Sequence, residues 1–534
     1  MTASRLAFLV HSWLGLKLFL VLTLVMLTGT LAVLRDEIDW LVYPQLRVVP
    51  GAERAGIDAI VAAAQAHDPA AGLLGEVPVV GAGPRTALGI VTVSPDSGVR
   101  RVWVDPYRGV VTGTTPLLTP GYFLAQLHAY LLIPVWGYAV VCSFAVVLLI
   151  ALVTGLVTYK RFWRGFFRVP RARSRRTLTG DLHRLGGVWS LWFLAIMVLT
   201  GLWYFWTFVG EPFLGFPHAT PHHDPPRLSE ADLDRLGPAP PARHSLDAMA
   251  ATVRREIPGF AIRHVTLPGA AEAPVTFLGN RGELFADLLS KVHVDPYSGA
   301  IVGRELAPQA PLLSWLDVLA DRFHYGDFGG LVTKLVWVLF GLITTAMAVT
   351  GLIVHADRTR RATAAHRPAM LRRLRWLRPW GGGMGLFKPV NLAVLGLSAW
   401  GASVAIGYYG GGAGLATTRF APQAVGPWRL GATAVASIGD TAPPVRPGGR
   451  AILFVDVCPG CWPAIRRLWA SVGDAPTEAE RTRVGGRPGY ATTFLRLPAR
   501  LDPGTRLWIV AEGWDGARHA ASWPLAADGP AGAP

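Results

Sequence analysis

The sequence has few acidic residues for its number of basic ones. Asp and Glu number 35 against 51 Lys and Arg, which gives a net charge of +16. Residues 160–184 and 357–388 each contain nine Lys or Arg and one acid, so these two segments account for the whole excess. Nucleic-acid binding is the alternative interpretation of such runs. However, basic residues that cluster beside apolar segments are typical of cytoplasmic loops of membrane proteins. We therefore expect no nucleic-acid partner.

Cysteine is also scarce, with three residues in 534. Cys142 lies in an apolar run, whereas Cys458 and Cys461 form a CxxC. This spacing suits a stapling disulfide, a redox pair or part of a metal site. The run "RAILFVDVCPGCWPAIRRLWASV" has the strand, CxxC, helix order of thioredoxin-like proteins. The Gly, Pro and short apolar runs elsewhere in 410–534 instead favour a small β-rich domain.

Half of the residues are apolar, and five apolar runs are long enough to cross a bilayer, which takes about 20 helical residues. A buried helix of a soluble protein is the alternative for any single run, but five runs together favour a membrane protein. The charged loops then place the N-terminus in the cytoplasm. The five expected spans are 1–34, 135–158, 188–209, 331–355 and 390–409. The segments expected outside are two exterior domains at 35–134 and 210–330 and an exterior β-rich domain at 410–534. The two cytoplasmic basic loops are 159–187 and 356–389.

One turn sequence occurs twice. "VDPYRGVVTG" starts at Val104 and "VDPYSGAIVG" at Val294, with six of ten positions identical. In both, Asp-Pro favours a turn and Gly allows the positive φ that closes it. A helix-like stretch (57–67 and 245–256) and strand-like runs (88–93 and 99–104; 262–266 and 275–278) precede the turns, which indicates a duplicated α/β unit.

The spans repeat as well, because four histidines precede a Thr-Gly pair at one of two fixed spacings. The spacing is 17 residues from His11 to Thr28 and from His183 to Thr200, and 26 residues from His128 to Thr154 and from His324 to Thr350. The repeating unit is therefore a span, an exterior α/β domain and a second span.

This pattern resembles the PepSY-associated transmembrane family over about residues 5–358. The resemblance rests on the two decamers, on "HSWLG" and "HRLGG" at the start of the odd spans, and on "TGL" at 200–202 and 350–352. It implies a bundle of about five transmembrane helices in a duplicated span–PepSY–span architecture with exterior α/β PepSY-like domains. Members of the family include iron-regulated membrane proteins and ferric-siderophore reductases that carry b-type haem. The resemblance does not cover the β-rich tail.

The four histidines are the candidate cofactor ligands. His11 and His183 lie on the cytoplasmic side, and His128 and His324 on the exterior side. A hydrogen-bonded interfacial histidine is the alternative for each, but four at two matched depths favour a function, since ionisable residues in spans are costly. Imidazole is a common axial ligand of haem iron, so pairing within each depth predicts two haem b sites. His355 is the rival ligand on the cytoplasmic side.

Other metal chemistry fits the sequence less well. No CxxCH occurs, so covalent attachment of haem is unsupported. A structural zinc site requires four ligands close together, which the spacing of these histidines does not provide.

The sequence thus predicts a haem-containing electron-transfer protein of the bacterial inner membrane, with periplasmic soluble domains. An unidentified cytoplasmic donor would supply electrons to an exterior acceptor, and the resemblance implies that this acceptor is a ferric siderophore. The activity would be that of a transmembrane ferric (siderophore) reductase, whose catalytic residues the sequence does not assign. Two alternatives remain: a membrane-anchored PepSY regulatory or binding protein without redox activity, and a thiol–disulfide electron carrier that uses Cys458 and Cys461.

The charge asymmetry of the loops gives a testable topology. Reporter fusions after Arg176 and after Arg367 should report a cytoplasmic location, and fusions after Gly113 and Gly303 an exterior one. An exterior signal at Arg176 would overturn the assignment of the spans.

Overall fold

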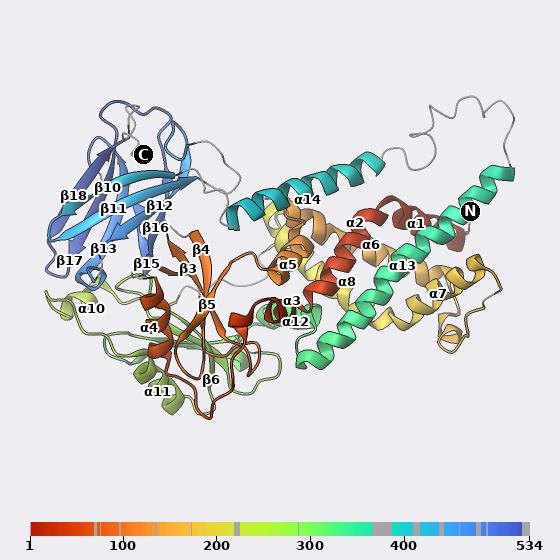
Figure 1. The fold of residues 1–534 in the computed structure, drawn as a ribbon, viewed down its shortest axis with the longest axis horizontal. Helices are drawn as coiled ribbons and strands as arrows, with labels where there is room; N and C mark the ends of the chain where they lie inside the picture. Colours follow the sequence, from red (N-terminus) through yellow and green to blue (C-terminus); the bar gives the residue numbers. More distant parts are fainter. Residues whose placement is uncertain are drawn as a thin grey trace. The chain divides into compact units, whose positions relative to one another are not determined.

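The computed structural model describes residues 2–525 except for 69–71, 75, 95–97, 134–135, 172, 218–224, 287, 366–386, 410–416, 437–442, 459, 477–481 and 488–489. The chain forms two compact units, each made from three separate stretches of sequence. The helical unit comprises Met1–Asp39, Pro120–Pro221 and Leu312–Ala405, and the β-rich unit comprises Trp40–Thr119, His222–Pro311 and Ile406–Pro534 (Figure 1).

Long apolar helices and shorter, more polar ones make up the helical unit. They are α1 (Ala3–Lys17), α2 (Phe19–Ala32), the start of α3 (Arg35–Val42), α5 (Pro120–Tyr130), α6 (Gly137–Thr158), α7 (Arg175–Trp189), α8 (Leu191–Phe205), α9 (Glu211–Leu214), α12 (Leu312–Tyr325), α13 (Gly330–Ala365) and α14 (Phe387–Tyr409). A π-helical turn, Trp206–Gly210, joins α8 to α9, and the 3₁₀ turn Phe162–Gly165 follows α6. Helix α6 packs against α1 and α8, whereas α13 packs against α2 and α7.

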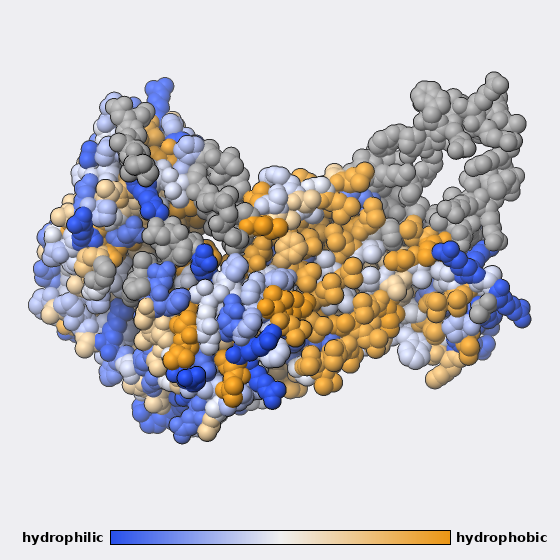
Figure 2. Space-filling view, in the orientation of Figure 1, coloured by the Kyte–Doolittle hydropathy of each residue, from blue (hydrophilic) through white to orange (hydrophobic). Residues whose placement is uncertain are grey.

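Among the described residues of this unit, three helical segments are long and apolar enough to cross a membrane: Gly137–Thr158, Leu191–Leu214 and Gly330–Val354. Shorter apolar helices occupy Leu20–Ala32 and Asn391–Ile406. Large apolar side chains are exposed on these helices, and Figure 2 shows them covering much of the visible face of the unit. Soluble proteins rarely expose so continuous an apolar surface, so this unit is the membrane part of the protein.

Two of the expected spans are interrupted. The first consists of α1 and α2, which are separated at Leu18, and the helix that carries His183 ends at Ser190 before α8 begins. Leu18 and Ser190 leave the helical conformation in the same way, with ψ of 7° and 4°. Each interruption comes seven residues after a histidine, His11 or His183. The same bend therefore follows each of these histidines. The basic segment expected to be a loop at 159–187 already contains most of α7.

The strands of the two α/β repeats form two antiparallel sheets within the β-rich unit. The first has the order β1 (Gly72–Leu74), β3 (Leu88–Ser94), β4 (Gly98–Val104), β5 (Val111–Pro116), and the second has the order β2 (Glu76–Pro78), β6 (Ala261–Thr266), β7 (Val275–Asn280), β8 (Ser290–Val294), β9 (Ile301–Glu305). Helices α4 (Ile57–His67) and α11 (Leu246–Glu256) accompany them, and a short helix, α10 (Glu230–Arg235), precedes α11. The predicted helices and strands of both repeats are confirmed. Strand β2 was not anticipated, because it comes from the first repeat but pairs with β6 of the second.

The repeated turn has the same hydrogen bonds in both copies. The carboxylate of Asp105 accepts the backbone N–H of Tyr107 at 2.8 Å, and that of Asp295 accepts the N–H of Tyr297 at 2.9 Å. Gly109 and Gly299 have φ of +63° and +71°, a conformation that favours glycine. The predicted turn is therefore confirmed in both places.

The C-terminal tail is a β-sandwich, which confirms the expected β-rich region. One sheet has the order β10 (Thr417–Val425), β11 (Trp428–Ala436), β12 (Arg450–Val457), β16 (Tyr490–Arg496), β15 (Gly485–Arg487), and the other β14 (Thr482–Arg483), β13 (Ile465–Gly473), β17 (Arg506–Gly513), β18 (Arg518–Pro524). The prediction of a helix after the CxxC is wrong, because a 3₁₀ turn, Trp462–Ala464, leads directly into strand β13. The alternating buried residues of β13 explain this, since a strand period of two buries one face.

The two α/β repeats share one hydrophobic core, although the sequence suggested two separate domains. Core residues come from both, including Ile60 and Ile90 of the first repeat and Met249 and Phe277 of the second. Burial of these side chains in a common core ties the stability of one repeat to that of the other.

The N-termini of α4 and α11 cap each other. Asp58 of α4 accepts the backbone N–H groups of Leu246 and Asp247, both at 2.9 Å. Asp247 of α11 in turn accepts those of Ile57 at 2.8 Å and of Asp58 at 3.2 Å. The first N–H groups of a helix have no partner within the helix, so each carboxylate supplies what the other helix lacks.

Removal of either carboxylate should loosen both helix starts. We expect Asp58→Ala and Asp247→Ala each to destabilise the shared core by about 1–2 kcal/mol, the usual cost of a lost helix cap. Hydrogen–deuterium exchange should accelerate at the first turns of both α4 and α11 in either variant. The matched Asp→Asn variants, which keep one acceptor oxygen, should lose less. Faster exchange confined to the helix that has lost its own aspartate would contradict the reciprocal arrangement, because each aspartate caps the other helix.

Candidate functional site

Four of the five candidate histidines meet in two pairs inside the helical unit. His11 of α1 lies beside His183 of α7, with ring centroids 6.4 Å apart and an angle of 78° between the ring planes. His128 of α5 lies beside His324 of α12, with centroids 5.9 Å apart and an angle of 30°. The structure thus brings together the two pairs that the sequence had grouped by depth.

Each imidazole is held through its Nδ1 atom by a neighbouring helix. The Nδ1 atom of His11 lies 3.0 Å from the carbonyl oxygen of Ala151, and that of His183 lies 3.0 Å from that of Met347. His128 makes the same contact to Val25 at 2.9 Å. A carbonyl oxygen only accepts hydrogen bonds, so Nδ1 carries the proton in these three rings.

Threonine hydroxyls complete this arrangement. Thr154 lies 3.3 Å from Nδ1 of His11, Thr350 lies 3.2 Å from Nδ1 of His183, and Thr200 lies 2.9 Å from Nδ1 of His324. Each of these hydroxyls donates its own proton to the carbonyl one turn earlier in its helix, for example Thr200 to Ile196 at 2.9 Å. The hydroxyl therefore accepts from the imidazole. All four rings keep their proton on Nδ1 and have a free lone pair on Nε2.

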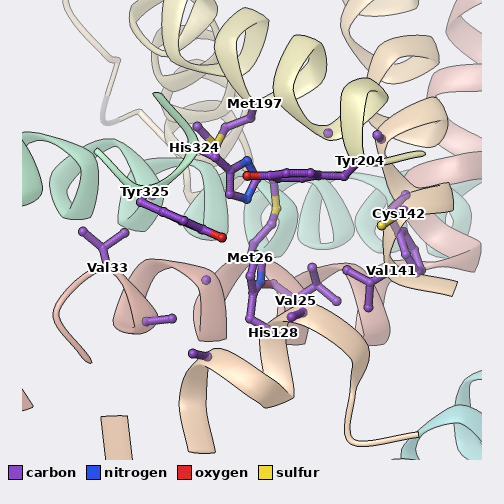
Figure 3. A pocket seen from close by; sticks show the side chains of 18 of the residues that line it. Val25, Met26, Val33, His128, Val141, Cys142, Met197, Tyr204, His324 and Tyr325 are labelled. Atoms are coloured by element: carbon purple, nitrogen blue, oxygen red, sulfur yellow. The ribbon is translucent and has the colours of Figure 1, made fainter. Parts of the chain in front are cut away.

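A cavity of about 610 Å³ adjoins the His128–His324 pair. Figure 3 shows His324 and Tyr204 side by side in it, with His128 and Met26 on the opposite wall. The Tyr204 ring lies 5.1 Å from that of His324, edge to face, and its hydroxyl donates to Asp321 at 2.7 Å. The volume and the mostly apolar lining are those of a site for a medium-sized organic ligand or cofactor.

The same cavity contains a buried lysine on a membrane helix. Lys334 of α13 is 9% exposed, and its ammonium group lies 2.9 Å from Glu37 and 3.4 Å from Asp36 at the start of α3. An unpaired ammonium group would be costly in this environment, so the carboxylates offset its desolvation. The pair also ties α3 to α13 at the edge of the cavity.

An ion-pair cluster lies close to the other histidine pair. Asp181, two residues before His183, accepts hydrogen bonds from Arg171 at 3.0 Å and from Arg184. The hydrogen bond from Arg171 lowers the pKa of the Asp181 carboxyl well below its usual range. The carboxylate therefore stays charged at neutral pH and holds the basic segment against α7.

His355, the fifth candidate, lies at a position whose side chain is outside the described residues. Among the residues that the structure describes, no group of three or more His, Cys, Asp or Glu is placed to hold a bare metal ion. Each imidazole pair instead offers two nitrogen ligands, one from each ring. Two ligands suit a metal whose other ligands belong to a cofactor, as in haem.

The comparison with protein families agrees with the order of these elements. A family model described as "PepSY-associated TM region" matches residues 8–358, more than half of the chain. The chain belongs to the PepSY-associated TM family. A second model, described as an uncharacterised conserved protein, matches residues 406–526, which include the sandwich.

One relative of this PepSY-associated TM protein is "Uncharacterized protein PA4219" of Pseudomonas aeruginosa. It is 30% identical over 157 residues, which are 28% of this chain and 39% of that protein. The matched region thus spans about two fifths of the length of the relative.

Sequence reasoning missed the direct role of the Thr-Gly pairs in this PepSY-associated TM protein. In the sequence these pairs mark the repeat, whereas the structure places Thr154, Thr200 and Thr350 against the histidines. The constant spacings were the available signal, but a spacing within one chain does not say which helix faces which. Tyr204 and Asp321 were also missed, because no short motif distinguishes them.

The CxxC of this PepSY-associated TM protein forms a disulfide, with Cα atoms 5.4 Å apart. Both cysteines pack at the edge of the sandwich core. The turn that follows is fixed from outside, because the indole of Trp514 donates to the carbonyl of Pro463 at 2.9 Å. These contacts are those of a stapled turn within the tail.

Proposed function

We propose that this chain is a membrane electron-transfer protein that holds two b-type haems, one between the imidazoles of each histidine pair. It would carry electrons from a donor on the cytoplasmic side to an exterior acceptor, a ferric siderophore. The observation that carries the proposal is the pairing of the four imidazoles. The ring centroids are 6.4 Å apart in the His11–His183 pair and 5.9 Å apart in the His128–His324 pair.

This spacing fits one iron atom between two imidazoles. A nitrogen ligand lies about 2 Å from a first-row metal, so two rings on opposite sides of one ion have centroids about 6 Å apart. Rings that pack against each other without a metal also have centroids about 4.5–7 Å apart, so the distance alone does not distinguish the two cases. What favours a shared metal is that both pairs combine this distance with imidazoles whose Nδ1 already has an acceptor and whose Nε2 is free.

The protonation state of the rings supports the same proposal. A metal-ligating histidine usually donates its second N–H to a carbonyl or another acceptor, which fixes the tautomer and orients the ring. The Nδ1 contacts of His11, His183 and His128 to backbone carbonyls have this form. The cavity beside His128 and His324 supplies apolar space for a flat cofactor at the exterior pair.

The haems would supply one-electron chemistry, and the protein residues would bind them and set their positions. The histidines would act as axial ligands, and the apolar helices would exclude water from the cavity. We further propose a duplicated five-span architecture, in which α1 with α2 and α14 complete the three longer spans. In it, His11 and His183 lie near the cytoplasmic face and His128 and His324 near the exterior face, so that the two sites act in series.

The acceptor and the location follow from the family resemblance and from the charged loops. Reduction of Fe(III) to Fe(II) weakens its binding to hard oxygen donors, which makes a ferric siderophore a suitable acceptor. We propose a bacterial inner membrane as the location, with the N-terminus in the cytoplasm and the β-rich unit in the periplasm.

Replacement of single histidines tests the assignment of the sites. His183→Ala should remove the cytoplasmic-side haem and His324→Ala the exterior one, so each variant should keep about half of the Soret absorbance. Both should block electron flow across the membrane, because the sites lie in series. His67→Ala, at the exposed end of α4, is the control and should keep both haems.

The partner of His183 is decided by comparing His11→Ala with His355→Ala. The 6.4 Å contact predicts that His11→Ala alone changes the low-spin spectrum. A change caused only by His355→Ala would replace His11 as the ligand, and no change in either variant would refute the cytoplasmic haem site.

A second candidate function, thiol–disulfide transfer through the CxxC, has its own test. We expect Cys458→Ser to reduce the stability of the tail by about 2 kcal/mol, the loss for a short disulfide loop. Haem content and reduction should not change. Thermal unfolding and stopped-flow reduction of the same preparation measure both. Loss of electron transfer with an unchanged melting temperature would favour the thiol carrier.

A further inference from the structure

The Thr-Gly pairs touch the histidines in a crossed pattern. In the first repeat, His11 rests on the Thr154–Gly155 region of α6, and His128 rests on the Val25–Gly29 turn of α2. In the second repeat, His183 rests on the Thr350–Gly351 region of α13, and His324 contacts Thr200 of α8. Every histidine is thus held by the other span of its own repeat.

We propose that these Thr-Gly pairs are positioning residues that set the orientation of each imidazole toward the haem. This inference rests on the proposed function, since it concerns the same two sites. It assigns one task to Thr154, Thr200 and Thr350, which accept the Nδ1 proton. It assigns another to Gly29, Gly155 and Gly351, which leave room for the ring.

The glycines differ in how closely the ring approaches. A Cβ atom on Gly29 would lie 2.6 Å from Cε1 of His128, closer than real contacts allow. At Gly351 the corresponding distance to Cε1 of His183 is 3.1 Å, and at Gly155 the distance to Cε1 of His11 is 3.5 Å. The sites should therefore tolerate an added methyl group in the order Gly155, Gly351, Gly29.

The threonines differ as well, and one of them provides a control. His324 has Thr200 as the acceptor for Nδ1, so it depends on this hydroxyl more than the other rings do on theirs. Thr28 occupies the equivalent register position in the first repeat, but its hydroxyl donates to Leu24 at 2.7 Å and to Val25 at 3.2 Å. The ring of His128 is held by the carbonyl of Val25 instead.

The arrangement has a spectroscopic consequence. The ring planes are close to perpendicular at the His11–His183 pair, at 78°, and closer to parallel at the His128–His324 pair, at 30°. Perpendicular axial imidazoles leave two iron d orbitals nearly equal in energy, whereas parallel ones split them. Electron paramagnetic resonance of the oxidised protein should therefore show a strongly anisotropic low-spin signal and a separate, rhombic one.

The glycine test compares haem content in the purified full-length protein. Gly29→Ala should lose the exterior haem, which is half of the total, and the rhombic signal with it. Gly351→Ala should lose part of the cytoplasmic-side haem, and Gly155→Ala the least of the three. Gly396→Ala of α14, where an added Cβ would meet nothing within 4 Å, should keep both haems. Equal haem content in Gly29→Ala and Gly396→Ala would overturn the role of the glycines.

The threonine test compares the spectrum and potential of the exterior haem in protein that has kept both haems, so misfolded protein without haem does not contribute to the comparison. Thr200→Val should shift the rhombic signal and the potential of the exterior haem, and Thr200→Ser, which restores the hydroxyl, should return both. Thr28→Val should behave like the wild type. Identical spectra and potentials in Thr200→Val and Thr28→Val would overturn the positioning role while leaving the haem sites in place. Wild-type protein that contains no haem would instead refute the proposed function, and this inference with it.

Discussion

A buried imidazole must have an acceptor for its N–H group, and this requirement organises the helical unit. Water is not available between membrane helices, so an unsatisfied N–H would cost several kcal/mol. Here the acceptors are backbone carbonyls and threonine hydroxyls of a neighbouring helix, at 2.9–3.3 Å. Each contact fixes one helix against another and at the same time frees Nε2. The packing of the helices and the chemistry of the site therefore depend on the same hydrogen bonds.

Equivalent features recur in both halves of the chain. His11 and His183 each lie against a backbone carbonyl and a threonine hydroxyl of a neighbouring helix. The interruptions at Leu18 and Ser190 follow their histidines by the same number of residues. In the β-rich unit, the two repeats go further and complete each other: Asp58 and Asp247 exchange caps, and β2 joins the sheet of the other repeat. A duplicated sequence gives similar surfaces in both repeats, and the reciprocal caps and the shared core are contacts between such surfaces.

Many turns, helices and strands of this fold could be predicted from the sequence, because they depend on residues that are close together in the chain. The DPY turns, the helix at 57–67 and the strands around 90 and 264 follow from turn residues and apolar periodicity, and the structure contains all of them. The grouping of the histidines by depth followed from the order of the spans. Contacts between distant segments could not be predicted in this way. The pairing of β2 with β6 and the contact of Thr350 with His183 depend on which faces meet in three dimensions. The helix expected after Cys461 failed for a related reason: its apolar residues are buried by the facing sheet, and that burial favours a strand.

The number of haems per polypeptide tests the central claim most directly. The protein should be purified in detergent from cells that make haem, and the pyridine haemochrome should be measured against the protein concentration. Two b-type haems per chain, both low-spin, are the predicted result, because each imidazole pair would supply two ligands to one iron. A chain that is folded and carries no haem would contradict the account, and the paired histidines would then serve only to pack the helices.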